Sequence, residues 1–151
     1  MTWLHLCISP VAGGKTRYSR HYARMNPGTV RLCPDELRAV IGESESDQTV
    51  NFPVFQTLHF TTEHLLRQGY SVIIDATNYT KKSRKGLLEI AKKCGAKTRA
   101  ICFCVSIEEA KRRNAQRERV VPEEVIDKQY AGLQPPEDGE FDDVVQIAYD
   151  K

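Results

Sequence analysis

The chain has 151 residues, of which 40% are apolar and 28% are charged, and its formal net charge is +2. This length favours one domain with one hydrophobic core and is too short for two ordinary domains. No apolar run approaches the ~20 residues that a membrane-spanning helix needs. The first residues also lack the charged and apolar regions of a signal peptide, so we expect a cytoplasmic protein with no membrane partner.

The cysteines and histidines indicate no structural metal. The five cysteines include no C-x-x-C pair, and the four histidines lack the spacing of zinc ligands. Charge is distributed unevenly: residues 80–119 carry 13 Lys/Arg against 4 Asp/Glu, whereas residues 120–151 carry 2 against 9. The basic stretch favours an anionic partner, a nucleotide or a nucleic acid, although a solvated helix face would explain many of its lysines.

The first element is an apolar strand, residues 3–8, which leads through residues 9–14 into a predicted helix over 16–25. A strand, a glycine-rich turn and a helix in this order are typical of a phosphate-binding loop. In such loops a lysine reaches the terminal phosphates, backbone N–H groups surround them, and a Ser or Thr hydroxyl holds Mg²⁺. Lys15 and Thr16 have the required positions.

The rest of this loop follows the pattern G-x-x-x-x-G-K-[ST] incompletely. Ser9 stands where the first glycine belongs, and we expect its side chain to restrict the backbone at that turn. The residues expected to bind the nucleotide phosphates here are Ala12, Gly13, Gly14, Lys15 and Thr16.

A short strand, residues 29–32, precedes a helix that contains Asp35 and Arg38. These residues lie one helical turn apart, so a carboxylate and a guanidinium project side by side from the carboxyl end of a strand. A plain ion pair at a helix start is the alternative interpretation. A helix then spans roughly residues 55–66.

The next strand, residues 71–74, delivers Asp75 and the residues Ala76, Thr77 and Asn78 at its carboxyl end, where α/β sheets place ligand groups. An aspartate there is typical of the carboxylate that supports Mg²⁺, directly or through water. The alternative is an aspartate that only begins a turn.

Later elements continue the alternation of helices and strands: a helix ending at Gly95, a strand over 99–105, a helix from Ser106 through Arg119, a helix over 122–131 and a strand over 144–149. Arg113 and Arg117 are four residues apart, and a shared helix face would suit an anion between them. A solvated helix is the alternative. The pattern predicts an α/β domain over residues 1–151, with a mostly parallel sheet, helices on both faces and a helical lid over about 107–131.

These motifs, in this order, resemble the 5′-hydroxyl polynucleotide kinase domain of phage and of RNA- and DNA-repair enzymes, which belongs to the P-loop kinases. The resemblance covers nearly the whole chain, with Ser9 and Ala12 as departures. No D-x-D-G-T phosphatase signature occurs, so only a kinase module is implied. The matching residues are Gly14-Lys15-Thr16, Asp35, Arg38, Asp75-Ala76-Thr77-Asn78, Arg113-Asn114, Arg117 and Val121-Pro122.

The resemblance implies ATP as the phosphate donor, Mg²⁺ as the cofactor and a 5′-OH end of RNA or DNA as the acceptor. Asp35 would be the general base, Arg38 would grip the acceptor phosphate, and Arg117 with Arg113 would stabilise the donor phosphates. Lys15, Asp35, Arg38 and Arg117 are thus the expected catalytic set. The metal would be held by Thr16 and Asp75, and the acceptor by Asp35, Arg38, Asp75, Thr77 and Asn78.

Two other functions fit parts of the pattern. A P-loop kinase for a small-molecule or tRNA-linked hydroxyl shares Lys15, Asp35 and a lid, but a neutral small acceptor gives Arg38 no phosphodiester to hold. A non-catalytic nucleotide- or nucleic-acid-binding module would need neither a base nor a metal carboxylate, so Asp35 and Asp75 argue against it.

Overall fold

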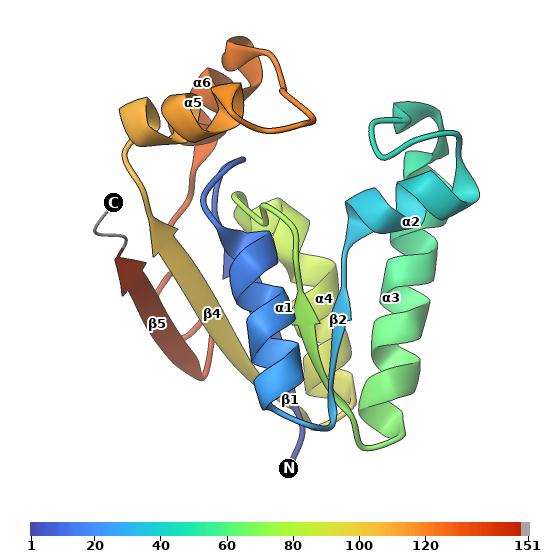
Figure 1. The fold of residues 1–151 in the computed structure, drawn as a ribbon. Coiled ribbons are helices and arrows are strands. Elements are labelled where there is room, and N and C mark those ends of the chain that lie inside the picture. Colours follow the sequence, from blue (N-terminus) through green and yellow to red (C-terminus); the bar gives the residue numbers. More distant parts are fainter. Residues whose placement is uncertain (149–151) are drawn as a thin grey trace.

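The computed structural model describes residues 1–148 and shows a five-stranded sheet with helices on both faces (Figure 1). All neighbouring strands run parallel, in the spatial order β2-β3-β1-β4-β5. The sheet confirms the predicted α/β class. The prediction of the last strand extended to Tyr149, which lies outside the described residues. The strands are β1 (Trp3–Ile8), β2 (Thr29–Leu32), β3 (Ser71–Ile74), β4 (Lys97–Cys104) and β5 (Asp143–Ala148).

Six α-helices and one 3₁₀ helix connect these strands. They are α1 (Lys15–Met25), α2 (Pro34–Ile41), η1 (Gln48–Val50), α3 (Asn51–Arg67), α4 (Lys81–Lys93), α5 (Ile107–Ala115) and α6 (Glu123–Gly132). Local sequence explains several of their starts: Ser106 caps α5 by accepting from the Glu109 N–H, and Pro34 begins α2. Within residues 1–148, no helix has the length and apolar character to cross a membrane.

The central strands are apolar on both sides because the sheet is covered on both sides. In β1, alternate residues Leu4, Leu6 and Ile8 pack toward α3 and α4, while Cys7 packs in a smaller cluster with residues of α1. Figure 1 shows α1 on one face and α3 and α4 on the other. This arrangement brings the carboxyl ends of all strands to one edge, beside α2, α5 and α6.

The helix that was predicted to run through Arg119 ends at Ala115 instead. The side chain of Asn114 accepts from the Val121 N–H at 3.0 Å and donates to the Val121 carbonyl at 2.8 Å, so the chain folds back on itself after α5. Such side-chain pairing with the backbone competes with helical hydrogen bonds. The prediction that Arg113 and Arg117 share a helix face is therefore wrong, because Arg117 lies in the bend that follows.

Candidate functional site

The loop between β1 and α1 surrounds the amino end of α1. Ala12 and Gly14 have φ angles of 65° and 94°, in the left-handed region, and Ser9 is not among the residues with positive φ. The expected restriction at Ser9 is therefore wrong: the position that favours glycine but lacks it is Ala12.

Ser9 is instead accommodated by a glycine four residues later. It is fully buried, its Oγ donates to the Pro10 carbonyl at 2.8 Å, and its N–H donates to the Thr77 carbonyl at 3.0 Å. A Cβ on Gly13 would lie 1.8 Å from Ser9 Oγ. Gly13 is thus needed because its backbone passes directly over the serine side chain.

Lys15 and Thr16 begin α1 at the junction of two cavities. The loop cavity, of about 390 Å³, lies over the phosphate loop and α1, and the cleft cavity, of about 560 Å³, extends toward α2, α3 and α6. Burial lowers the pKa of Lys15 below its ordinary value, although the Asp75 carboxylate opposes this shift. Both cavities are lined by Lys15, Thr16, Cys33, Asp35, Arg117 and Arg119.

Asp75 is buried at the end of β3 and is paired with an arginine that the sequence reasoning missed. Its Oδ2 accepts from Arg31 Nη2 at 2.5 Å and from Ser19 Oγ at 3.3 Å. Arg31 also forms an ion pair with Glu36 at 2.6 Å. A charged residue within the apolar strand TVRL was the available signal, because buried arginines are normally paired.

Asp35 lies between two guanidinium groups. Its Oδ1 accepts from Arg38 Nη1, and its Oδ2 accepts from Arg119 Nη2 at 2.7 Å. The pairing with Arg38 follows from the spacing of these residues in α2, whereas Arg119 comes from the bend after α5. Nothing in the sequence distinguished Arg119 from the other basic residues of that stretch.

Arg38 is held in place from three sides. It is 9% exposed, its Nε donates to Asn51 Oδ1 at 2.9 Å, and its guanidinium lies 5.7 Å from the centroid of the Phe55 ring. Its Nη1 donates to Asp35. The guanidinium therefore has a fixed orientation at the wall of the cleft cavity.

The α5–α6 segment contributes further contacts to the same region. Arg113 donates to Glu109 at 2.9 Å and lines the loop cavity with Arg117. The guanidinium of Arg117 forms no hydrogen bond or ion pair within residues 1–148. Burial, followed by the nearby positive charge of Arg119, lowers the pKa of Arg117 below its ordinary value. Gln129 in α6 accepts from the Val11 N–H at 2.7 Å, which ties this helix to the phosphate loop.

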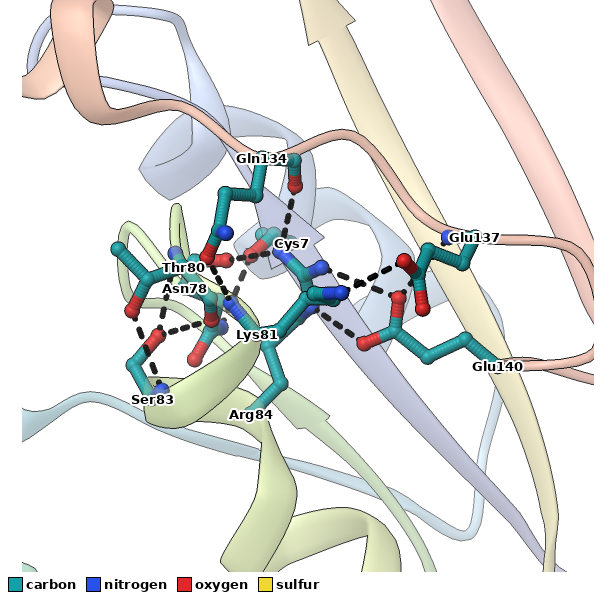
Figure 2. Close-up of polar contacts among 9 residues, drawn as sticks. All are labelled: Cys7, Asn78, Thr80, Lys81, Ser83, Arg84, Gln134, Glu137 and Glu140. Carbon is teal, nitrogen blue, oxygen red and sulfur yellow. Dashed lines mark hydrogen bonds and ion pairs between the residues drawn. The ribbon is translucent and has the colours of Figure 1, made fainter.

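The residues after β3 divide between the cavity and the interior. Thr77 lines the cleft cavity, but Asn78 does not, because its Nδ2 donates to the Cys7 carbonyl at 2.9 Å. Figure 2 shows Asn78 beside the fully buried Arg84, whose Nη1 donates to the Asn78 and Gln134 carbonyls. Arg84 also forms two hydrogen bonds to Glu140, at 2.8 and 3.0 Å. The side chain of Asn78 is thus not brought together with the other predicted site residues.

The described residues contain no group of three or more His, Cys, Asp or Glu side chains placed to hold a metal ion. The charges that meet at the two cavities are mainly arginine and lysine, with the carboxylates of Asp35, Glu36, Glu45 and Asp75. This composition suits a polyanion such as a triphosphate with an additional acidic or hydroxyl-bearing partner.

The chain is similar to a curated protein in sequence and to several solved structures in fold. The chain is similar to L-seryl-tRNA(Sec) kinase of Methanococcus maripaludis, with 29% identity over 128 residues, 79% of this chain and 46% of that protein. It is similar to a chain of the Pnkp1/Rnl/Hen1 RNA repair complex, with a TM-score of 0.78 and 23% identity over 88% of this chain and 44% of that one. It is also similar to Kti12 of Chaetomium thermophilum, solved with ADP-AlF3, with a TM-score of 0.73 and 18% identity over 97% and 89% of the two chains.

The chain thus spans less than half the length of the seryl-tRNA kinase and of the RNA-repair chain. Its five-stranded parallel sheet and six α-helices have the arrangement of a P-loop kinase fold. Residues 4–136 match the family described as AAA domain, and the chain belongs to that family.

Proposed function

We propose that this chain transfers the γ-phosphate of ATP to the 5′-hydroxyl end of RNA or DNA, as nucleic-acid repair requires. One observation carries the proposal: Asp35, with Arg38 at its side, faces the same cavity as Lys15 and Thr16. A hydroxyl acceptor needs a carboxylate to receive its proton, and a nucleic-acid end also brings a phosphate for a guanidinium. The similarity to a chain of an RNA repair complex supports this choice of acceptor.

On the donor side, the backbone of residues 12–14 and Lys15 would bind the β- and γ-phosphates. Arg117, with Arg113, would stabilise the transferring group, and we propose that the segment over about 107–131 acts as a lid. The transferring phosphoryl group spreads charge over its oxygens, so a single arginine from a lid can contribute ~10³–10⁵ in rate. Because the guanidinium of Arg117 lines both cavities and forms no hydrogen bond or ion pair within the described residues, it is available for such a role.

On the acceptor side, Asp35 would take the hydroxyl proton as the oxygen bonds to the γ-phosphorus. The bond from that phosphorus to the β–γ bridging oxygen breaks, and ADP leaves. Arg38 would hold the first phosphate on the 3′ side of the reacting nucleoside. Its Nε and Nη1 are engaged by Asn51 and Asp35, and Nη2 makes no hydrogen bond within residues 1–148, so that group can bind a phosphate oxygen.

Mg²⁺ would be held by Thr16 and, through water, by Asp75, and it would neutralise negative charge on the donor phosphates. The residues fit this ion. Thr16 is exposed to both cavities, and Asp75 lines one of them while its Oδ2 is bound by Arg31 and Ser19. Mg²⁺ keeps several waters and needs few protein ligands, so the absence of a multi-carboxylate cluster in the described residues is no obstacle.

A hydroxyl carried by an aminoacyl-tRNA is the second candidate acceptor. The 29% identity to L-seryl-tRNA(Sec) kinase supports it, and the catalytic requirements are the same: a base, a phosphate loop and a lid. In this reaction Arg38 would contact a phosphate or ribose of the tRNA acceptor end rather than the nucleotide that reacts.

The experiment that tests the proposal offers γ-labelled ATP and Mg²⁺ to three kinds of acceptor: 5′-OH RNA and DNA oligomers, the same oligomers with a 5′-phosphate, and seryl-tRNA with a 5′-phosphate. We expect label on the 5′-OH oligomers, released as labelled 5′-mononucleotide after nuclease digestion. Label that mild alkali releases from tRNA as phosphoserine would establish the second candidate instead. Intact ATP binding without transfer to any 5′-OH oligomer would exclude the first.

A further inference from the structure

Arg119 joins the two walls of the site where the two cavities meet. Its Nη2 donates to Asp35 Oδ2 at 2.7 Å, and its Nε lies 3.3 Å from Glu45 Oε2, in the segment between α2 and η1. That Nε is buried and has no hydrogen-bond partner. Buried donors nearly always form a hydrogen bond, whereas this Nε has only its ion pair with Glu45, so at the meeting point of two cavities a ligand can supply the missing acceptor.

Two cationic donors hold Asp35, although a base must present an oxygen to the acceptor hydroxyl. Each of its oxygens already accepts a charge-assisted hydrogen bond, one from Arg38 and one from Arg119. Departure of one of the two guanidinium groups would open an Asp35 oxygen to the acceptor hydroxyl.

Arg119 is the one that is able to leave. Arg38 is fixed by Asn51 and by the Phe55 ring, and its side chain is 11% exposed. The side chain of Arg119 is 34% exposed, and it lies in a bend rather than in a helix. After leaving Asp35, Arg119 would keep only the half-exposed Glu45 as an anionic partner, and an oligonucleotide supplies phosphates close to the hydroxyl that reacts.

We propose that Arg119 moves from Asp35 to the acceptor backbone, where it binds a second phosphate beyond the one held by Arg38. This inference rests on the proposed polynucleotide kinase function. Arg119 is then a specificity-determining residue, because an acceptor with two or more phosphates frees the base that it needs. A nucleoside 3′-monophosphate offers only the phosphate that Arg38 holds, and a neutral hydroxyl offers none, so with these acceptors Arg119 stays on Asp35.

The first test is binding of a fluorescent 5′-OH DNA hexamer at several salt concentrations, measured by anisotropy. The variants are Arg119→Gln and, as control, Arg112→Gln, which removes the same charge from an exposed position that lines neither cavity. For single strands, each phosphate contact contributes about 0.7 to the slope of log affinity against log salt. We expect Arg119→Gln to lose about 0.7 of slope and roughly tenfold in affinity, and Arg112→Gln to match wild type.

The second test compares kcat/KM for the hexamer with that for a nucleoside 3′-monophosphate. Arg119→Gln should lower the ratio about tenfold, through a higher KM for the hexamer and without an equal loss in the mononucleotide reaction. A further variant acts in the opposite direction: Glu45→Gln removes the carboxylate that competes for Arg119 and should tighten hexamer binding. Glu43→Gln in the same exposed segment is its control. Thermal unfolding confirms that each variant is folded.

The outcomes separate the inference from the function on which it rests. An unchanged salt slope together with an unchanged acceptor ratio in Arg119→Gln overturns the inference, because Arg119 would then only fasten the α5–α6 segment to the core. An equal loss for both acceptors also overturns it. Failure of the wild-type protein to phosphorylate any 5′-OH acceptor refutes the proposed function, and the inference with it.

Discussion

The contact between Ser9 and Gly13 predicts an effect of Gly13→Ala that depends on a single neighbour. The added Cβ would lie 1.8 Å from Ser9 Oγ and 3.1 Å from Ser9 Cβ. To relieve this overlap the hydroxyl must turn away from the Pro10 carbonyl, which leaves a fully buried hydroxyl without its 2.8 Å hydrogen bond. We expect the change to cost about 1–3 kcal/mol, or roughly 5- to 150-fold in ATP affinity where the loop itself deforms.

The same substitution should cost far less after Ser9→Gly. Once the serine side chain is removed, the nearest atom to the new Cβ is the Pro10 carbonyl oxygen at 3.3 Å, a contact that a small shift relieves. We expect a cost below about 1 kcal/mol in that background and a coupling of ~1–2 kcal/mol between the two positions. Ser9→Gly by itself should not tighten ATP binding, because Ser9 does not have a positive φ and the substitution removes a buried hydrogen bond.

The four proteins of this cycle are compared by calorimetric titration with ATP and Mg²⁺ and by denaturant unfolding. The titration reports the shape of the loop, and the unfolding reports the packing beneath it. If Gly13→Ala costs as much with glycine at position 9 as with serine, the serine side chain is not what demands a glycine at 13, and the reasoning fails.

Four other predictions concern the same loop, the base, the acceptor contact and the core. Ala12→Gly should stabilise the loop by up to about 1 kcal/mol, measured by ATP titration, because Ala12 has a φ of 65°; weaker binding would contradict it. Asp35→Ala should nearly abolish transfer and keep ATP affinity, whereas loss of ATP binding would place Asp35 in the metal shell. Arg38→Lys should lower kcat/KM for a 5′-OH oligomer almost as much as Arg38→Ala, about 30- to 150-fold, because an ammonium lacks the planar set of donors with which the guanidinium can hold Asn51 and a phosphate in fixed directions; a lysine variant close to wild type refutes this. Burial, and to a smaller extent the charge of Arg99, lowers the pKa of His5 from 6.5 to about 4. The free energy of unfolding should therefore fall by up to about 3 kcal/mol as the pH drops from 6.5 toward 4, because only the unfolded chain takes up the proton in this range. Urea unfolding of wild type and His5→Phe across this range checks it, and an equal pH dependence of the two proteins would contradict it.

The candidate site residues whose positions the sequence predicts are those that lie at the carboxyl ends of the strands. Lys15, Asp35 and Asp75 each come just after a strand or open the helix that follows one, and parallel strands bring their carboxyl ends to one edge. Apolar runs and glycines were enough to find these strands. The sequence could therefore predict that these three residues lie at one edge of the sheet.

The sequence did not reveal Arg31 and Arg119 as site residues, because their roles depend on contacts between segments that are distant in the sequence. Arg31 became important only because β2 and β3 are neighbours, which places it on Asp75. Arg119 reaches Asp35 because the Asn114 amide pairs with Val121 and ends α5 early, a competition that helical periodicity does not show. These partners are chosen by tertiary structure, so spacing along the chain contains no signal for them.

The buried ion pair between Arg84 and Glu140 in Figure 2 limits where the chain could be cut to give a folded fragment. The match to the family ends at residue 136, but Glu140, which neutralises Arg84, lies beyond that point, as does the whole of β5. A fragment cut at the family boundary would keep a fully buried guanidinium and lose its carboxylate, and breaking such a pair typically costs ~3–5 kcal/mol. Because Arg84 also holds the Asn78 carbonyl, the damage would reach the loop that carries Asp75. The smallest folding unit is therefore longer than the unit that sequence similarity outlines.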